Sequence, residues 1–129
     1  MHRINTTGCS INYRNWLARQ NGNKGEQIAQ ERIDDLELVN GLIDAQLKDR
    51  PVEIKTCQEW HSNGRGRCRG RFVLRKDQHE YLTKFNGLYV MIVLMGNGRI
   101  RMRIINAKDL FPNGRFRRKI SWKEIFDRE

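Results

Sequence analysis

Residues 42–45 read LIDA and residues 51–56 read PVEIKT, and these two short stretches decide how the chain folds. Each is an apolar run that contains charged residues, as is typical of a strand buried on one side. Side chains two residues apart on a strand share a face, so Glu53 and Lys55 are expected to point together. The intervening valine and isoleucine are expected to point into a core. A hairpin joining the two stretches would bring Asp44 beside Glu53 at one edge of a sheet.

The chain has 129 residues, the length of one compact domain, and we expect a single domain over residues 1–129. Hydrophobic residues make up 38%, which is enough for one core. No stretch approaches the roughly 18 apolar residues of a membrane helix, so no membrane partner is expected. The N-terminus lacks the layout of a signal peptide, which favours an intracellular protein. The three cysteines are an odd number, so a disulfide framework is not expected.

The charge of the chain indicates a polyanionic partner. There are 25 lysines and arginines against 15 acidic residues, which gives a formal net charge of +10. Such an excess in a small domain favours nucleic acid, with a merely basic protein as the alternative. Clustering favours nucleic acid, because four arginines fall within residues 65–71 and a second basic cluster lies at residues 115–119. The Arg-Gly run is expected to bind backbone phosphates and to add affinity rather than sequence choice.

Turn residues and hydrophobic periodicity divide the chain into short elements. Helices are expected at residues 24–33, 77–85 and 122–127, and strands at residues 36–39, 42–47, 52–57, 71–75, 88–95 and 99–105. Residues 1–21 are expected to form an N-terminal arm or short helix, and residues 58–70 a mobile loop. The motif-bearing core spans residues 24–95, followed by a C-terminal strand and helix over residues 99–127. The predicted fold class is α/β, a single domain whose central mixed β-sheet is flanked by helices.

In their order along the chain, the motifs resemble those of the PD-(D/E)xK nuclease superfamily, with its restriction-endonuclease-like fold. The matching stretches are GEQIA at residues 25–29, ID at 43–44, VEIK at 52–55 and QHEY at 78–81. The layout is similar to that of small members such as the archaeal Holliday-junction resolvases, and Gln78-x-x-Tyr81 is similar to an element of the RecB-like branch. The resemblance covers about residues 24–95. It departs from the family where isoleucine precedes Asp44 in place of proline, and in the long Arg/Gly loop.

The resemblance implies a metal site for phosphodiester hydrolysis. Its ligands would be Asp44, Glu53 and the main-chain carbonyl of Ile54. Mg²⁺ is the expected ion, with Mn²⁺ able to take its place, because Mg²⁺ prefers a few carboxylates plus water. Such an ion makes a water nucleophilic near neutral pH and stabilises charge on the phosphoryl oxygens.

The implied catalytic residues are Glu26, Asp44, Glu53, Lys55 and Gln78. Lys55 would hold the attacking water or neutralise the scissile phosphate. Glu26 would bind a second ion or orient a metal-bound water, and Gln78 would orient water or phosphate. Contacts with DNA are expected from the basic residues of the motifs and of the Arg/Gly loop: Lys24, Arg65, Arg67, Arg69, Arg71 and Lys76.

These observations favour a Mg²⁺-dependent DNA endonuclease that is selective for DNA structure, such as Holliday-junction or branched DNA, and that works as a homodimer. One alternative is a small restriction or repair nuclease, and another is a non-catalytic nucleic-acid-binding module on the same fold. A zinc-bearing interaction domain is the third alternative. Charge alone does not distinguish DNA from RNA.

Several single residues have plainer explanations than chemistry. An isolated Glu-x-Lys is ordinarily a solvated cross-strand charge pattern, and only the accompanying acidic and amide residues favour a site here. Tyr81 is expected in the core, and His61 and His79 are expected at the surface.

Overall fold

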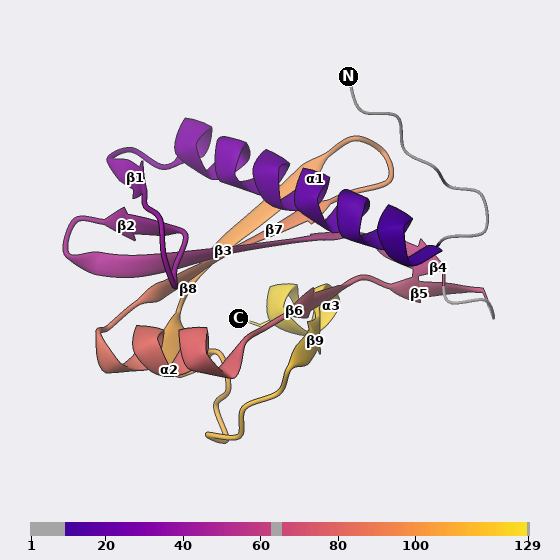
Figure 1. The fold of residues 1–129 in the computed structure, drawn as a ribbon. Coiled ribbons are helices and arrows are strands. Elements are labelled where there is room, and N and C mark those ends of the chain that lie inside the picture. Colours follow the sequence, from indigo (N-terminus) through magenta and orange to yellow (C-terminus); the bar gives the residue numbers. More distant parts are fainter. Residues whose placement is uncertain (1–9, 63–65, 129) are drawn as a thin grey trace.

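A five-stranded mixed sheet forms the centre of the computed structural model, which describes residues 10–62 and 66–128 (Figure 1). The strand order is β1-β2-β3-β7-β8. The first three strands form an antiparallel meander, β3 and β7 are parallel, and β7 and β8 are antiparallel. The bounds are β1 Leu36–Leu38, β2 Ala45–Leu47, β3 Arg50–Gln58, β7 Leu88–Leu94 and β8 Ile100–Asn106.

Helices cover both faces of this sheet (Figure 1). The long helix α1 packs on one face, where it shares a hydrophobic core with β3 and β7. On the other face, α2 and the C-terminal elements close a second core. The helices are α1 Ser10–Arg32, α2 Lys76–Lys84, the 3-10 helix η1 Ala107–Asp109 and α3 Trp122–Phe126.

Strand β7 is buried between the two cores, which explains its uninterrupted apolar sequence. Leu88, Val90 and Ile92 face the core of α1. The alternate residues, of which Tyr89 is the largest, face the core of α2. A strand with both faces covered has no solvent face on which to place polar residues. The prediction of a buried strand at residues 88–95 is therefore confirmed.

The predicted meander, the hairpin turn at residues 96–98 and the last helix are also confirmed, but the strand predicted at residues 42–47 begins only at Ala45, because residues 42–44 lie in a bend. β7 and β8 pair in register on either side of that turn. Ser121 caps α3, and its hydroxyl accepts a hydrogen bond from the backbone N–H of Lys123 at 3.3 Å. The basic side of β8 packs on α3, because Arg101 stacks over Phe126 with 4.9 Å to the ring centroid.

Of the two alternatives for residues 1–21, an arm or a short helix, residues 10–21 are helical, and the predicted turn at residues 21–23 with a separate helix from residue 24 is wrong. Helix α1 begins at Ser10 and passes through Asn21-Gly22-Asn23 without a break. A glycine inside a helix costs about 1 kcal/mol relative to alanine. Packing of α1 on the sheet outweighs that cost, since Ile28 and Ala29 are buried against it. Residues 1–9 of the predicted arm lie outside the described residues.

The prediction of a loop over residues 58–70 is also wrong at residues 60–62 and 67–69, whereas residues 63–65 lie outside the described residues. Strands β4 (Trp60–Ser62) and β5 (Arg67–Arg69) form an antiparallel hairpin apart from the central sheet. The Arg-Gly composition does not predict this hairpin, because the strand pairing is stabilised by contacts that local propensity does not encode. Arg67 and Arg69 both stack over Trp60, with 4.8 and 4.9 Å to the ring centroid.

The predicted strand at residues 71–75 is β6 (Arg71–Val73), and its partner is β9 (Lys119–Ser121), which the sequence did not predict. This small two-stranded sheet closes the core beneath β3 through Phe72 and Ile120. Within the described part of the chain, no helix is both long enough and apolar enough to span a bilayer.

Candidate active site at the open edge of strand β3

Strand β3 has a free edge at which the sequence-predicted residues gather. Along one side it pairs with β7 from Val52 to Gln58. Along the other side β2 pairs only with residues 50–52. Because residues 40–44 bend before β2 begins, β3 continues past its partner from Glu53 onward. The backbone groups of that edge are available to side chains and to a ligand.

Glu53 and Lys55 point to the same face of β3, as the two-residue spacing predicted. Val52 and Ile54 face the core of α1 on the other side. The Glu53 side chain is only 3% exposed, and its Oε2 lies 3.1 Å from Nζ of Lys55. This ion pair directs the lysine along the edge of the sheet.

Two crossed hydrogen bonds join Asp44 to β3, one to the Glu53 side chain and one to the backbone of Ile54. The backbone N–H of Asp44 donates to Oε1 of Glu53 at 3.1 Å. The backbone N–H of Ile54 donates to Oδ2 of Asp44 at 3.0 Å. The Asp44 carboxylate thus bonds to the backbone of β3 just beyond the point where β2 stops pairing with it. The predicted proximity of the two carboxylates is present.

Gln78, near the start of α2, connects the lysine to the bend that carries the aspartate. Its Oε1 accepts from Nζ of Lys55 at 3.1 Å, and its Nε2 donates to the carbonyl of Leu42 at 2.8 Å. The side chain is buried, with 6% exposed. Gln78 therefore holds the Lys55 ammonium group in position. The sequence predicts a different role for Gln78, the orientation of water or phosphate.

Glu26 approaches the edge from the opposite face of the sheet, on α1. It is half-buried. Burial and the negative charge of Asp44 both raise its pKa. The structure thus places Glu26 within electrostatic reach of Asp44, which lies in the bend before β2.

The burial of Glu53 has a large electrostatic effect. Burial raises the pKa of its carboxyl to about 7, with the positive charge of Lys55 opposing the rise and Asp44 adding to it. Burial likewise raises the pKa of Tyr89, and the charge of Glu53 adds to that rise. Tyr89 lies next to Glu53 in the parallel register of β3 and β7.

The pair of Tyr89 and His79 was missed from the sequence. Nδ1 of His79 lies 2.9 Å from the Tyr89 hydroxyl, and burial lowers the pKa of the imidazole. His79 is half-buried rather than a surface histidine. The sequence contains a partial indication of this pair, because Tyr89 is the one residue with a hydroxyl group in the apolar run at residues 88–95. Tyr81, in contrast, is 38% exposed and stacks on Phe85 at 4.7 Å, so its predicted place in the core is wrong.

The donors at this edge suit a hard cation. Asp44 and Glu53 supply carboxylate oxygens, and the carbonyl of Ile54 faces the same edge as its N–H. One or two carboxylates with a carbonyl and water match the preference of Mg²⁺. Among residues 10–62 and 66–128, no group of three or more His, Cys, Asp or Glu side chains is placed to hold a metal ion. Any ion at this edge would therefore keep several water ligands.

The predicted DNA contacts lie on several elements around this edge. Arg67 and Arg69 project from the β4–β5 hairpin. Arg71 is exposed on β6, and Lys24 and Lys76 are exposed on α1 and α2. Arg65 falls outside the described residues.

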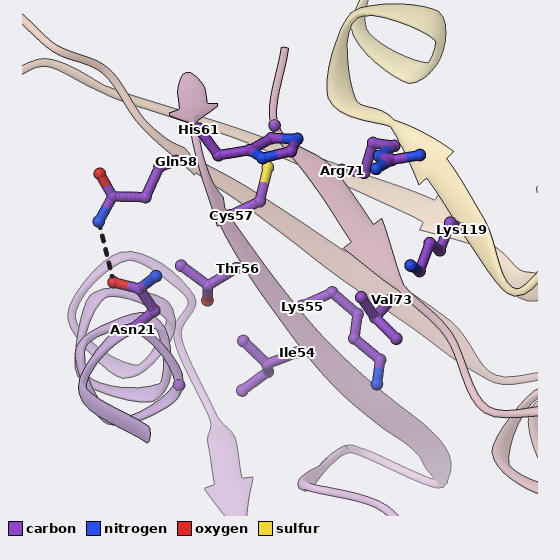
Figure 2. A pocket seen from close by; sticks show the side chains of 12 residues that line it. Asn21, Ile54, Lys55, Thr56, Cys57, Gln58, His61, Arg71, Val73 and Lys119 are labelled. Atoms are coloured by element: carbon purple, nitrogen blue, oxygen red, sulfur yellow. Dashed lines mark hydrogen bonds between the residues drawn. The ribbon is translucent and has the colours of Figure 1, made fainter. Parts of the chain in front are cut away.

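A pocket of about 530 Å³ continues from Lys55 along β3 (Figure 2). α1 borders it at Asn21, where a hydrogen bond of 3.3 Å from the Gln58 side chain joins helix and strand. Arg71 and Lys119 border it from β6 and β9. Sequence reasoning assigned these two cations to separate basic clusters, and only the β6–β9 pairing brings them together.

A family model described as a PD-(D/E)XK nuclease superfamily domain matches residues 12–127 of the chain. No curated protein and no solved structure matches the chain. The match covers the first helix, the central sheet and the last helix, and therefore the whole edge described above.

Proposed function

The chain belongs to the PD-(D/E)XK nuclease superfamily, and we propose that it is a divalent-metal-dependent DNA endonuclease with its active site at the free edge of β3. Over the described residues its fold, a five-stranded mixed sheet with three α-helices, agrees with the restriction-endonuclease-like fold. Membership of this superfamily makes the chain a nuclease, whose substrate is a nucleic acid. The choice of DNA, the ion and the residue roles are the proposal.

The observation that carries the proposal is the crossed pairing of Asp44 and Glu53 at an unpaired strand edge. Two carboxylates held together repel, and burying Glu53 costs further free energy. A chain that keeps such an arrangement has a use for it, since perturbed carboxylates gather at functional sites. A non-catalytic module on the same fold would have no need of the pair.

We propose Mg²⁺ at Asp44, Glu53 and the Ile54 carbonyl, with Mn²⁺ able to replace it. When bound, the ion supplies charge stabilisation at the phosphoryl oxygens and a water of lowered pKa. Lys55 places a positive charge beside the carboxylates, where it can bind the scissile phosphate or hold the attacking water. Gln78 keeps that ammonium group in position.

We further propose that the enzyme selects DNA by structure, such as Holliday-junction or branched DNA, and acts as a homodimer. The basic hairpin supports binding through phosphates, which carries no sequence information. A small restriction or repair nuclease is the alternative. The described residues of each chain contribute one edge with one carboxylate pair, so a dimer supplies two sites that can cut two strands in one binding event.

The test compares cleavage of linear, nicked, flap and four-way DNA by wild type, Asp44→Ala and Glu53→Ala, with Mg²⁺ or Mn²⁺. Both variants are expected to lose cleavage by about a hundredfold or more, because each removes a proposed metal ligand. Both are expected to keep DNA binding, measured by fluorescence anisotropy without divalent ion.

Glu37→Ala is the matched control, since Glu37 is an exposed carboxylate on the neighbouring strand β1. It is expected to cleave like wild type. Cleavage that survives in Glu53→Ala would refute the catalytic assignment. A wild-type protein that binds but cuts none of the substrates would indicate the non-catalytic module.

A further inference from the structure

The pocket beside the active site has the position of a substrate subsite. It runs along β3 from Ile54 to Gln58, a span of roughly 13 Å at the rise of a strand. Lys55 lies in its wall and also in the ion pair of the active site. A ligand that fills the pocket therefore lies next to the position proposed for the scissile phosphate (Figure 2).

The lining of the pocket favours an anion that carries hydrogen-bonding groups. Lys55, Arg71 and Lys119 contribute positive charge, and none of the lining residues is Asp or Glu. Within the described part of the chain, Arg71 and Lys119 form no ion pair with a carboxylate. The amides of Asn21 and Gln58 add polar groups at the far end.

Flat and apolar groups complete the lining. The His61 ring lies beside the Cys57 thiol at the end of the pocket away from Lys55 (Figure 2). Burial raises the pKa of that thiol to about 12, so it presents a neutral surface. Together these features match one nucleotide, with a phosphate for the cations and a base for the ring and amides.

We propose that this pocket binds one unpaired nucleotide of the substrate strand, immediately beside the cleaved phosphodiester. Arg71 and Lys119 hold its phosphate, and the end near His61 receives its base. The inference rests on the proposed nuclease function and gives it a substrate class. A pocket of about 530 Å³ has room for one nucleotide, and in this proposal the nucleotide enters it by leaving the helical stack.

This pocket supplies a physical basis for structure selectivity. Taking a paired base out of a duplex costs free energy, and the cost is least where the base is already unpaired. Branch points, flaps and bulges offer such nucleotides, whereas intact duplex does not. Selection among DNA structures then needs no base-reading element.

The first test measures entry of the base without cleavage. Asp44→Ala protein is mixed with a duplex that carries 2-aminopurine as a single unpaired nucleotide beside the mapped cleavage position. The emission is expected to rise on binding as the base leaves the stack. Introducing Arg71→Ala and Lys119→Ala into the Asp44→Ala protein is expected to abolish this rise in emission. Introducing Arg115→Ala and Lys108→Ala instead, which removes two exposed cations outside the pocket lining, is expected to preserve it.

The second test compares kcat/KM for that duplex and for its fully paired counterpart. Arg71→Ala/Lys119→Ala is expected to lower the preference for the unpaired nucleotide by about tenfold or more, since each charged hydrogen bond contributes at least that factor. Val73→Trp is expected to act likewise by filling the pocket while keeping both cations. Val73 lines the pocket and is 49% exposed, so the fold tolerates the change.

An equal loss on both substrates would overturn the proposal, because the two cations would then act only through general attraction of DNA. Binding of free deoxynucleoside monophosphate in a titration, with no change in 2-aminopurine emission, would also overturn it in favour of a free-nucleotide site. Failure of the wild type to cleave any substrate would refute the nuclease assignment. With no cleavage position to map, 2-aminopurine is placed as a single unpaired nucleotide at the centre of the duplex. Its emission with Asp44→Ala protein would still decide whether the pocket receives an unpaired base.

Discussion

At the scale of single residues, the site holds charge where burial disfavours it. Glu53 is 3% exposed, yet its carboxylate accepts from Asp44 and pairs with Lys55. The opposing charge of Lys55 only partly offsets burial, so the pKa remains raised to about 7. The protein therefore loses stability in order to keep an ionisable group at this edge.

This cost predicts the pH dependence of stability without metal. The unfolded chain ionises Glu53 near the ordinary pKa of 4.5, whereas the folded chain ionises it near 7. Between these values the folded state binds more protons, so its free energy of unfolding falls as pH rises, by about 3 kcal/mol in total. Glu53→Gln removes this fall. Its stability relative to wild type is expected to increase from about pH 5 to about pH 8, as measured by urea unfolding with a chelator.

Glu37→Gln, an exposed carboxylate on β1, serves as the control and is expected to follow the wild-type pH dependence. The prediction would be contradicted if the free energies of unfolding of Glu53→Gln and wild type changed in parallel with pH. The Glu53 carboxyl would then titrate alike in the folded and unfolded states.

Gly25 is required for the close approach of α1 to β3. A Cβ built at this position would lie 1.9 Å from Oγ1 of Thr56. Gly25→Ala is expected to cost about 1 to 3 kcal/mol, because overpacking outweighs the gain in helix propensity. Gly22→Ala in the same helix meets nothing within 4 Å and is expected to stabilise the protein by up to about 1 kcal/mol.

The double variant Gly25→Ala/Thr56→Ala separates the clash from other effects. Since Thr56→Ala removes the atom that a Cβ would meet, Gly25→Ala should become less costly by about 1 kcal/mol or more in that background. Thermal or urea unfolding measures all four proteins. Equal stability of Gly25→Ala and Gly22→Ala would show that the helix moves away from β3 without cost.

At the scale of elements, the β4–β5 hairpin carries the exposed positive charge. Arg67 and Arg69 stack over Trp60, which leaves their guanidinium edges directed outward for hydrogen bonds. A hairpin fixes the spacing of these groups, whereas a loop would have to order on binding. The basic side of β8, in contrast, is used against α3, where Arg103 donates to the carbonyl of Arg128 at 2.9 Å.

Replacing Arg67 and Arg69 by alanine is therefore expected to weaken DNA binding and to reduce its salt dependence. If each contacts one phosphate, the slope of log K against log salt should fall by about 2. Lys84→Ala/Lys108→Ala removes the same charge from α2 and η1 and is expected to leave the slope nearly unchanged. An unchanged slope in the arginine variant would mean that the hairpin does not touch DNA.

At the scale of the whole molecule, one sheet separates two cores and exposes one reactive edge. Helix α1 covers the face opposite α2, so the edge of β3 lies open between them (Figure 1). The net charge of +10 attracts any nucleic acid to the surface. In the mechanism proposed above, the position of the free edge then decides where a strand is cut.

The proposed homodimer has a direct consequence for mixed assemblies. Dimers of one wild-type chain and one Asp44→Ala chain are expected to nick a single strand of a substrate that wild type cuts on both. Nicked and doubly cut products are separated on native and denaturing gels, and sedimentation gives the mass. A mass of one chain on DNA, together with double cutting, would contradict the dimer.

Much of the architecture follows from local patterns. Three such patterns act through neighbours a few residues away: the alternation over residues 99–105, the Gly-Asn-Gly turn and the capping sequence at Ser121. The strand, turn and helix that they predict are present. The order of the motifs at Asp44, Glu53 and Lys55 likewise indicated the superfamily to which the chain belongs. The extent of α1 and the β4–β5 hairpin were not predicted, since packing overrides the glycine-rich composition there.

The sequence by itself determined the strand faces, the turn chemistry and the identity of the charged groups, because these depend on backbone geometry and covalent spacing. Only the tertiary structure decided which groups meet. The parallel pairing of β3 with β7 places Tyr89 beside Glu53, and α2 brings Gln78 to Lys55. The β6–β9 pairing creates the pocket. Such contacts join residues far apart in the chain, so they depend on how whole elements pack and on the entropy of closing the loops between them.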